Sequence, residues 1–131
     1  TAAAFFGMGL LLLVVFALFY QLTTSYDIHS EIESNNSAVG IALGGNLIGI
    51  GLVTFKAVFG DFDGWSPAIA SFLTFGVIGF GLLYVMRVLI DKLLLPTVST
   101  SHALAIDRNV GVAFIESAVV IGAAMILFLA I

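Results

Sequence analysis

The residues best suited to do chemistry in this chain are a glutamate and an arginine that lie inside apolar sequence. Glu116 stands seven positions into the apolar stretch that begins at Val110, and Arg87 stands near the end of another apolar stretch, Pro67–Ile90. An unpaired carboxylate about 10 Å below a membrane surface is costly, so it must be paired, protonated or in contact with a polar cavity. We favour a structural ion pair between Glu116 and Arg87, and a proton-handling or ion-conducting carboxylate is the alternative.

Two further polar residues interrupt the second apolar stretch. Asn46 lies inside it, where an amide is expected to hydrogen-bond a neighbouring helix, with contact to a permeant ion as the alternative. Lys56 lies near its far end and is expected to extend toward Asp61 or Asp63. Asn46 therefore predicts a contact between helices, and Lys56 with the two aspartates predicts a turn at the membrane interface.

Other chemistry is not indicated by the sequence. His29 and His102 lie in polar connections and are expected to be exposed and unliganded, because two histidines without a positioned third ligand do not define a metal site. The alternative is that they approach each other and bind a metal or sense pH. The chain has no cysteine, so disulfides and thiolate ligands are excluded. The sequence shows neither a nucleophile elbow nor a phosphate-binding loop. We therefore expect no enzymatic activity, no bound metal and no cofactor.

Long apolar stretches must position these side chains, and each is long enough to cross a bilayer. About 20 helical residues span the hydrocarbon core, and backbone groups in lipid must satisfy one another, which favours helices. Ser66 is expected to cap the third stretch, with Pro67 at its first helical position. The predicted fold is an all-α integral membrane protein in one module, residues 1–131. The four predicted helices are Ala2–Leu22, Ala38–Phe59, Pro67–Ile90 and Val110–Ile131.

Composition and charge agree with this class and restrict the partners. The chain is 61% hydrophobic and 9% charged, which leaves no room for a soluble domain, and its net charge of −4 argues against nucleic-acid binding. The lipid bilayer is therefore the first partner, and other membrane subunits or further copies of the chain are expected. Arg87, Lys92 and Arg108 flank the longer connections, which predicts that these connections are cytoplasmic and both termini outside.

An internal repeat is indicated when the sequence is shifted by 73 positions. The shift places His29 on His102 and Asn36 on Asn109, together with several apolar identities. Asn36 and Asn109 each precede an apolar stretch, where an amide side chain can cap the helix. The prediction is two helical hairpins of the same sense, residues 2–59 and 67–131, related by an axis along the bilayer normal.

Small residues recur at four-residue spacing in the second and fourth stretches. In lipid, helix association depends on close backbone approach, which small residues permit. We expect them to pack the four helices against one another, and a contact between subunits is the alternative. The residues are Gly40, Gly44, Gly45 and Gly49 in the second stretch, and Ala118 and Gly122 in the fourth.

The order of these features resembles a known family. An acidic connection is followed by NSAVGIALGG and a glycine-rich span, and a second copy opens with RNVGVAFIESA. This order resembles the YjfL-like family of small bacterial inner-membrane proteins of unknown function, over nearly the whole chain. The resemblance implies a multi-pass protein of the bacterial inner membrane and brings no established activity.

The predicted role follows from this architecture. We expect a non-enzymatic accessory or structural subunit of a homo-oligomer or of a larger membrane complex, because the chain consists almost entirely of helices that can pack in lipid. The alternative is a small channel or transporter component for ions or protons, built around Glu116, Arg87 and Asn46.

Overall fold

The computed structural model describes residues 2–58, 64–94 and 99–130, and these residues form helices joined by short connections. No β-strand occurs among them, so the predicted all-α fold class is confirmed. The helices are α1 (Ala2–Leu22), α2 (Ile28–Glu33), α3 (Ser37–Val58), α4 (Trp65–Leu89), the π-helical turn η1 (Ile90–Leu94), α5 (Thr100–Ala105) and α6 (Val110–Ala130).

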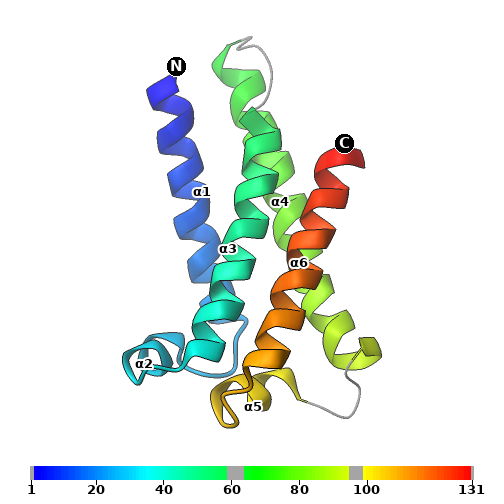
Figure 1. Cartoon of the computed structure of the whole chain (residues 1–131). Coiled ribbons are helices and arrows are strands. Elements are labelled where there is room, and N and C mark those ends of the chain that lie inside the picture. The colour runs from blue at the N-terminus through cyan, green and yellow to red at the C-terminus, as the bar shows by residue number, and fades with distance from the viewer. Residues whose placement is uncertain (1, 59–63, 95–98, 131) are drawn as a thin grey trace.

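Four of these helices are long and apolar enough to cross a membrane, namely α1, α3, α4 with η1, and α6. Figure 1 shows α1 and α4 running from the end that holds both termini toward the short helices α2 and α5, while α3 and α6 return. Helix α3 contacts the other three long helices. Half of its most apolar segment is buried inside the bundle, compared with 6% in α1. Helix α3 is therefore the centre of the bundle and α1 its most lipid-exposed member.

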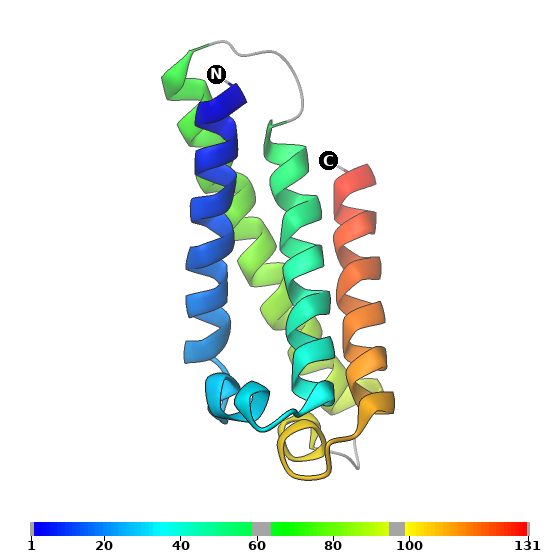
Figure 2. The same ribbon diagram turned by 60° about the vertical axis from the view of Figure 1, so that its left-hand side comes forward.

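Aromatic rings attach α1 to α4. The ring of Phe80 lies 5.1 Å from that of Phe16 and 5.3 Å from that of Phe19, and Phe5 stacks on Phe72 at 6.1 Å. Such ring pairs add about 0.5–1.5 kcal/mol each beyond the area they bury. Figure 2 shows α4 starting beside the N-terminal part of α1 and then crossing obliquely behind α3.

The start of α4 differs from the prediction made for Ser66 and Pro67. The helix begins at Trp65, and its N-cap is Gly64, with φ of 114° and no side-chain cap hydrogen bond. Ser66 is therefore inside the first turn and is not the cap. Pro67 is tolerated there because the first-turn N–H groups have no partner within the helix. Gly64 is suited to the cap because residues with a Cβ rarely adopt its positive φ.

The short helices α2 and α5 lie across the end of the bundle opposite the termini, and their caps resemble each other (Figure 1). Asp27 accepts a hydrogen bond from the backbone N–H of His29, and Ser99 accepts one from that of His102. The hydrogen bond from the Ser30 hydroxyl holds the pKa of Asp27 below its usual value. Both histidines are exposed and lie at this same end.

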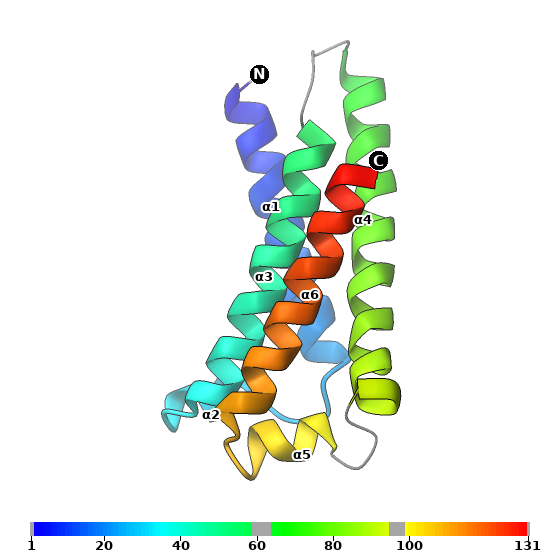
Figure 3. The ribbon, with the colours of Figure 1, turned by 45° about the vertical axis from the view of Figure 1, so that its right-hand side comes forward.

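Close packing between α3 and α6 depends on two of the predicted glycines. A Cβ at Gly45 would overlap the Ser117 side chain and come within 2.7 Å of the Ser117 Cα atom, and a Cβ at Gly49 would lie 3.0 Å from Val120. The Ser117 hydroxyl donates to the Ile41 carbonyl at 2.8 Å across the same contact. Figure 3 shows the two helices side by side, with α4 on their other flank.

The other small residues do not pack the helices in the expected way. A Cβ at Gly40, Gly44 or Gly122 would meet no atom within 4 Å, so no neighbouring helix packs closely against these glycines. Ala118 and Gly44 line an open groove between α3 and α6. The expectation that all six small residues pack the chain internally is wrong for these positions, because the four-residue stripes extend around to the outer surface of the bundle.

Candidate functional site

Arg87 and Glu116 form an ion pair inside the bundle. The Arg87 Nε atom lies 3.5 Å from Oε1 of Glu116. The Glu116 side chain is 2% exposed and that of Arg87 is 17% exposed, so the pair is shielded from solvent. The helices α4 and α6 run in opposite directions. Arg87 near the end of α4 and Glu116 near the start of α6 therefore lie at similar depths below the same membrane face. The structure thus brings together the two residues that the sequence singled out.

Arg87 also joins the end of α1 to this pair. Its guanidinium carbon lies 4.3 Å from the centre of the Tyr20 ring, an arrangement that suits a cation–π interaction. The same guanidinium donates hydrogen bonds to the hydroxyls of Thr23 and Thr24, at 3.1 and 3.0 Å. One side chain therefore connects α1, α4 and α6 at the end of the bundle that carries α2 and α5.

Three polar atoms near Arg87 lack hydrogen-bond partners among the described residues. They are Oε2 of Glu116 and the hydroxyls of Tyr20 and Tyr26, and we call Arg87 and these three residues the Arg87 cluster. The two tyrosine hydroxyls lie within hydrogen-bonding range of each other, although their arrangement falls short of full hydrogen-bond geometry. A buried polar atom without a partner costs about 1–3 kcal/mol.

Tyr26, which lies in the connection after α1, belongs electrostatically to this cluster. Burial raises the pKa of its hydroxyl to about 12, and the Glu116 carboxylate acts in the same direction while Arg87 opposes it. The Tyr20 hydroxyl is also within electrostatic range of Glu116 and Arg87, and the Asp91 carboxylate on η1 is within range of Glu116. The cluster is therefore a set of mutually interacting polar groups contributed by different elements.

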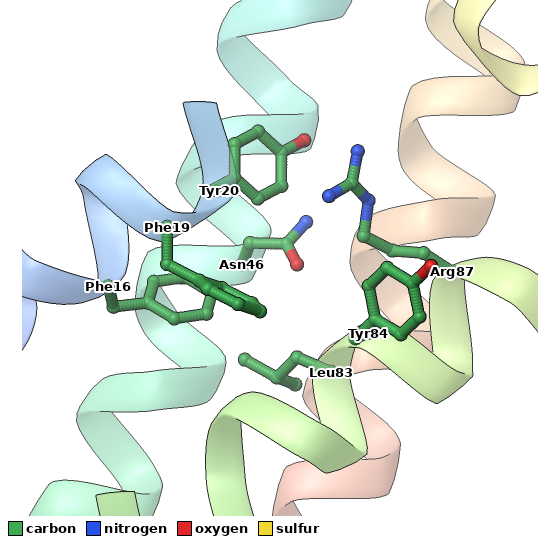
Figure 4. A pocket seen from close by; sticks show the side chains of 7 residues that line it. All are labelled: Phe16, Phe19, Tyr20, Asn46, Leu83, Tyr84 and Arg87. Carbon is green, nitrogen blue, oxygen red and sulfur yellow. The ribbon is translucent and has the colours of Figure 1, made fainter. Parts of the chain in front are cut away.

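Asn46 lies deeper in the membrane than the pair, beside a narrow crevice. Its Nδ2 donates to the carbonyl of Ala42 at 2.9 Å, so the amide bonds its own helix and not the neighbouring helix that we expected. Its Oδ1 has no hydrogen-bond partner within the part of the chain that the structure describes. Figure 4 shows Tyr20, Asn46 and Arg87 directed toward the same space, with Phe16 and other apolar side chains closing it. The gaps in this crevice are narrower than a water molecule.

Lys56 lies far from the Arg87 cluster, toward the end of α3 near the chain termini. Its Nζ atom is 5.4 Å from the centre of the Phe128 ring on α6. The predicted partners Asp61 and Asp63 lie outside the described residues. Lys56 thus contacts the apolar surface of α6 and takes no part in the intramembrane ion pair.

Asn36 and Asn109 stand directly before α3 and α6. Oδ1 of Asn36 accepts from the N–H of Val39 at 3.4 Å, and Oδ1 of Asn109 accepts from that of Val112 at 3.1 Å. Asn36 is 2% exposed, and its Nδ2 also donates to the Leu104 carbonyl at 2.8 Å. Asn36 therefore caps one helix and at the same time attaches the first connection to α5.

Sequence reasoning did not identify the tyrosines and threonines of the site. Tyr20, Thr23, Thr24 and Tyr26 cluster where the first apolar stretch becomes polar, and aromatic and hydroxyl residues are common at membrane interfaces for general reasons. The clustering of these four residues was the one feature of the sequence that could have indicated a polar site at the end of the first span. Their contact with Arg87 depends on where α1 ends relative to α4, which the sequence pattern does not specify.

Comparison with known proteins gives a family. Residues 1–131 match the family described as Domain of Unknown Function (DUF350). The chain belongs to the DUF350 family. This DUF350 chain is also 29% identical over 120 residues to the UPF0719 transmembrane protein YshE of Bacillus subtilis (strain 168), covering 92% of this chain and 84% of YshE. No solved structure matches it. The DUF350 chain is thus a membrane protein, like YshE.

Proposed function

We propose that this DUF350 protein is a non-enzymatic structural or accessory subunit of the bacterial inner membrane that assembles with further copies of itself. The observation that carries the proposal is the outer face of α3. The central helix of the bundle presents small residues to lipid, where they have no role in packing this chain. Membrane helices use such residues for close approach to another helix.

The outer face of α3 forms a continuous stripe. Gly40, Gly44 and Gly51 each have open space where a Cβ would lie, and Ile48, between them, is 56% exposed. Ile48 borders two open apolar grooves of about 420 Å³ each, one between α3 and α6 and the other between α1 and α3. A second copy related by a two-fold axis along the membrane normal would place the Ile48 side chains beside opposing glycines.

The contact between α3 and α6 supports a second copy as the occupant. Gly45 and Gly49 already allow α3 to approach α6 closely, with Ser117 and Val120 opposite them. The open groove is lined by Gly44, Gly45, Ser117 and Ala118 and is therefore continuous with that contact. The same helix thus presents a second glycine-rich surface of the kind that it uses within the chain.

The alternative of an ion or proton pathway has less support. The polar side chains of the bundle interior gather near the α2 and α5 end and extend as far as Asn46. Of the buried polar residues that the structure describes, Thr54 alone lies beyond Asn46, and its hydroxyl donates to the Ile50 carbonyl of its own helix. The remaining interior is lined by apolar residues such as Val53, Leu83 and Val120. Conduction would require a polar route through this region.

A bulky residue at Gly44 is expected to block self-association without disturbing the fold. Gly44→Leu adds a side chain in open space of the groove, and Gly81→Leu is a matched control because Gly81 on α4 is equally open. We expect Gly44→Leu to raise the dimer Kd on the order of tenfold or more, since each 1.4 kcal/mol of lost contact energy is a factor of ten. Analytical ultracentrifugation in mild detergent and cross-linking in membranes measure this change.

Two outcomes would contradict the proposal. The first is a wild-type protein that is monomeric in both assays. The second is an equal effect of Gly44→Leu and Gly81→Leu, which would point to general crowding. Stoichiometric co-purification of the wild type with a larger complex would support the accessory role, whereas ion flux by the purified protein that depends on Glu116 would support the alternative.

We further propose that the chain is a tandem, same-sense duplication of the YjfL-like type. Support comes from Asn35 and Arg108, the non-glycine residues with positive φ among those described, at 63° and 51°. They are 73 positions apart, which is the shift that aligns the two connections, and each immediately precedes a helix-capping asparagine. A left-handed backbone conformation is uncommon at residues other than glycine, and an arginine rarely adopts it. Its occurrence at both equivalent positions therefore favours a common origin of the two halves.

Cysteine labelling tests the predicted orientation. Ser25→Cys and Ser66→Cys place single thiols at exposed positions on opposite ends of the bundle, in a chain without other cysteines. We expect a membrane-impermeant maleimide to label Ser66→Cys in intact spheroplasts and Ser25→Cys only after permeabilisation. The reverse pattern would place the α2 and α5 end outside the cytoplasm.

A further inference from the structure

We propose that copies of this chain assemble head to tail, with the face of α6 that carries Ala118 in one copy packed on the face of α3 that carries Gly44 in the next. The inference rests on the proposed self-association and the proposed tandem duplication, and it names the two surfaces that meet. Helices α3 and α6 begin at Ser37 and Val110, so each residue of α3 has an equivalent 73 positions later in α6.

Within one chain, α3 and α6 meet through faces that are not equivalent. On α3 the contact is made by Gly45 and Gly49, which we call the Gly45 face. On α6 it is made by Ser117 and Val120, which we call the Ser117 face. A contact between two unlike faces is heterologous. The chain therefore also carries the equivalent of each face, and this contact uses neither equivalent.

The α6 equivalent of the Gly45 face consists of Ala118 and Gly122, and we call it the Ala118 face. The two glycines of the Gly45 face are buried, whereas Ala118 is exposed and Gly122 has open space where a Cβ would lie. Ile115, on the same side of α6, is 40% exposed. Helix α6 thus presents outward the counterpart of the surface with which α3 contacts it.

The α3 equivalent of the Ser117 face consists of Gly44 and Leu47, and we call it the Gly44 face. Gly44 has open space where a Cβ would lie, and Leu47 is only partly buried, beside the groove of about 420 Å³ between α1 and α3. Ser117 and Val120, by contrast, are buried against α3. The Gly44 face is therefore open where its counterpart on α6 is packed.

Helix α1 supports the same arrangement. Leu83 of α4 is 1% exposed, and its side chain lies 3.5 Å from the position of a Cβ at Gly49. The equivalent of Leu83 in α1 is Leu10, which is 46% exposed, and the equivalent of Gly49 in α6 is Gly122. A head-to-tail neighbour would bring Leu10 of one copy to Gly122 of the other. The contact would also cover α1, whose most apolar segment is only 6% buried inside the bundle.

The proposed contact is compatible with one orientation of all copies in the membrane. Helices α3 and α6 run in the same direction (Figure 1), and equivalent residues lie equally far from the starts of their helices. Copies inserted the same way therefore present Gly44 and Ala118 at similar depths. Repetition of such a contact closes a ring or continues as a filament. A two-fold pairing of two Gly44 faces is the competing geometry, and it would leave the Ala118 face in lipid.

Complementation between two variants tests the head-to-tail geometry. Gly44→Leu obstructs the Gly44 face and Gly122→Leu obstructs the Ala118 face, and Gly81→Leu is the control because Gly81 is equally open on α4. We expect each of the first two variants alone to associate with a Kd raised about tenfold or more. An equimolar mixture of the two should recover association as heterodimers, because each mixed pair retains one intact contact. Analytical ultracentrifugation in mild detergent measures both effects.

The outcomes of this experiment separate the geometry from self-association. Association of Gly122→Leu like that of the wild type, or a mixture that associates no better than Gly44→Leu alone, would overturn the head-to-tail contact. A wild type that is monomeric would overturn self-association itself, and the head-to-tail contact with it.

Cysteine cross-linking in membranes gives a second measurement. Because the chain has no cysteine, one copy can carry Gly44→Cys and a differently tagged copy Ala118→Cys. We expect oxidation to join these two chains several-fold more efficiently than it joins two Gly44→Cys chains. The pair of Gly81→Cys with Ala118→Cys is the matched control and should cross-link weakly. Preferential joining of two Gly44→Cys chains would overturn the head-to-tail geometry and leave self-association intact.

Discussion

Replacing Glu116 by alanine is expected to destabilise the protein by about 3–5 kcal/mol, because breaking a buried ion pair leaves the remaining charge uncompensated. Arg87 is the remaining charge, and the partners that its guanidinium would keep among the described residues are the Tyr20 ring and the Thr23 and Thr24 hydroxyls. Replacing both Arg87 and Glu116 by leucine is expected to recover much of the loss, since well-packed apolar residues often substitute for a buried pair without cost. Reversible unfolding in detergent measures these free energies.

A double-mutant cycle separates the pair from the individual residues. The variants are Glu116→Leu, Arg87→Leu and the combination, with Glu116→Gln as a control that removes charge and retains shape. Residues in contact show interaction energies of about 0.5–3 kcal/mol. If the effects of the single variants add to within about 0.5 kcal/mol, Arg87 and Glu116 do not interact, and the ion pair has no energetic role. Arg87→Leu should cost more than Glu116→Leu, because it also releases the end of α1.

Gly45→Ala is expected to have the second largest effect, a loss of about 1–3 kcal/mol from overpacking. The added methyl group would overlap the Ser117 side chain, and the Ser117 Cα atom at 2.7 Å prevents relief by side-chain rotation alone. The helices α3 and α6 must therefore separate, which stretches the hydrogen bond from Ser117 to the Ile41 carbonyl. Unfolding in detergent measures the loss of stability.

The neighbouring residue provides the control for this prediction. Gly44→Ala makes the same chemical change one residue earlier, where no atom lies within 4 Å of the added methyl group. We expect it to be neutral or to stabilise by up to about 1 kcal/mol, since alanine favours the helix over glycine. Combining Gly45→Ala with Ser117→Gly should recover part of the loss. Equal effects of Gly45→Ala and Gly44→Ala would show that the contact between α3 and α6 is not tightly packed.

Much of the fold could be predicted from apolar length alone. The predicted stretches agree with the observed helices to within two residues at the described ends, because a bilayer requires long apolar helices and the polar connections interrupt them clearly. The α4 start differed because Ser66 and Pro67 matched a common capping pattern, whereas Gly64 has the unusual φ that precedes the helix. Local signals of this kind locate a helix end only approximately.

The candidate site was predictable in part, because the depth of a charged residue in the membrane can be estimated from its position in an apolar stretch. Arg87 and Glu116 are rare charges at similar depths in consecutive antiparallel spans, so their contact follows from the costs of burying charge. Asn46 was harder, because an amide inside a helix can bond either its own backbone or a neighbour. Its bond to the Ala42 carbonyl and the crevice beside it depend on how α1 and α4 close around α3.

The sequence by itself determined that the chain spans a membrane four times, that Glu116 requires a partner and that small residues allow close helix approach. Only the tertiary structure decided which of the small residues face another helix. The long helices are apolar on every side, so no amphipathic pattern distinguishes Gly44 from Gly45, although one faces an open groove and the other faces Ser117. The same is true of Tyr20, which reaches Arg87 only because α1 ends beside α4. In lipid, helix orientation is set by packing between helices, and hydrophobicity does not specify it.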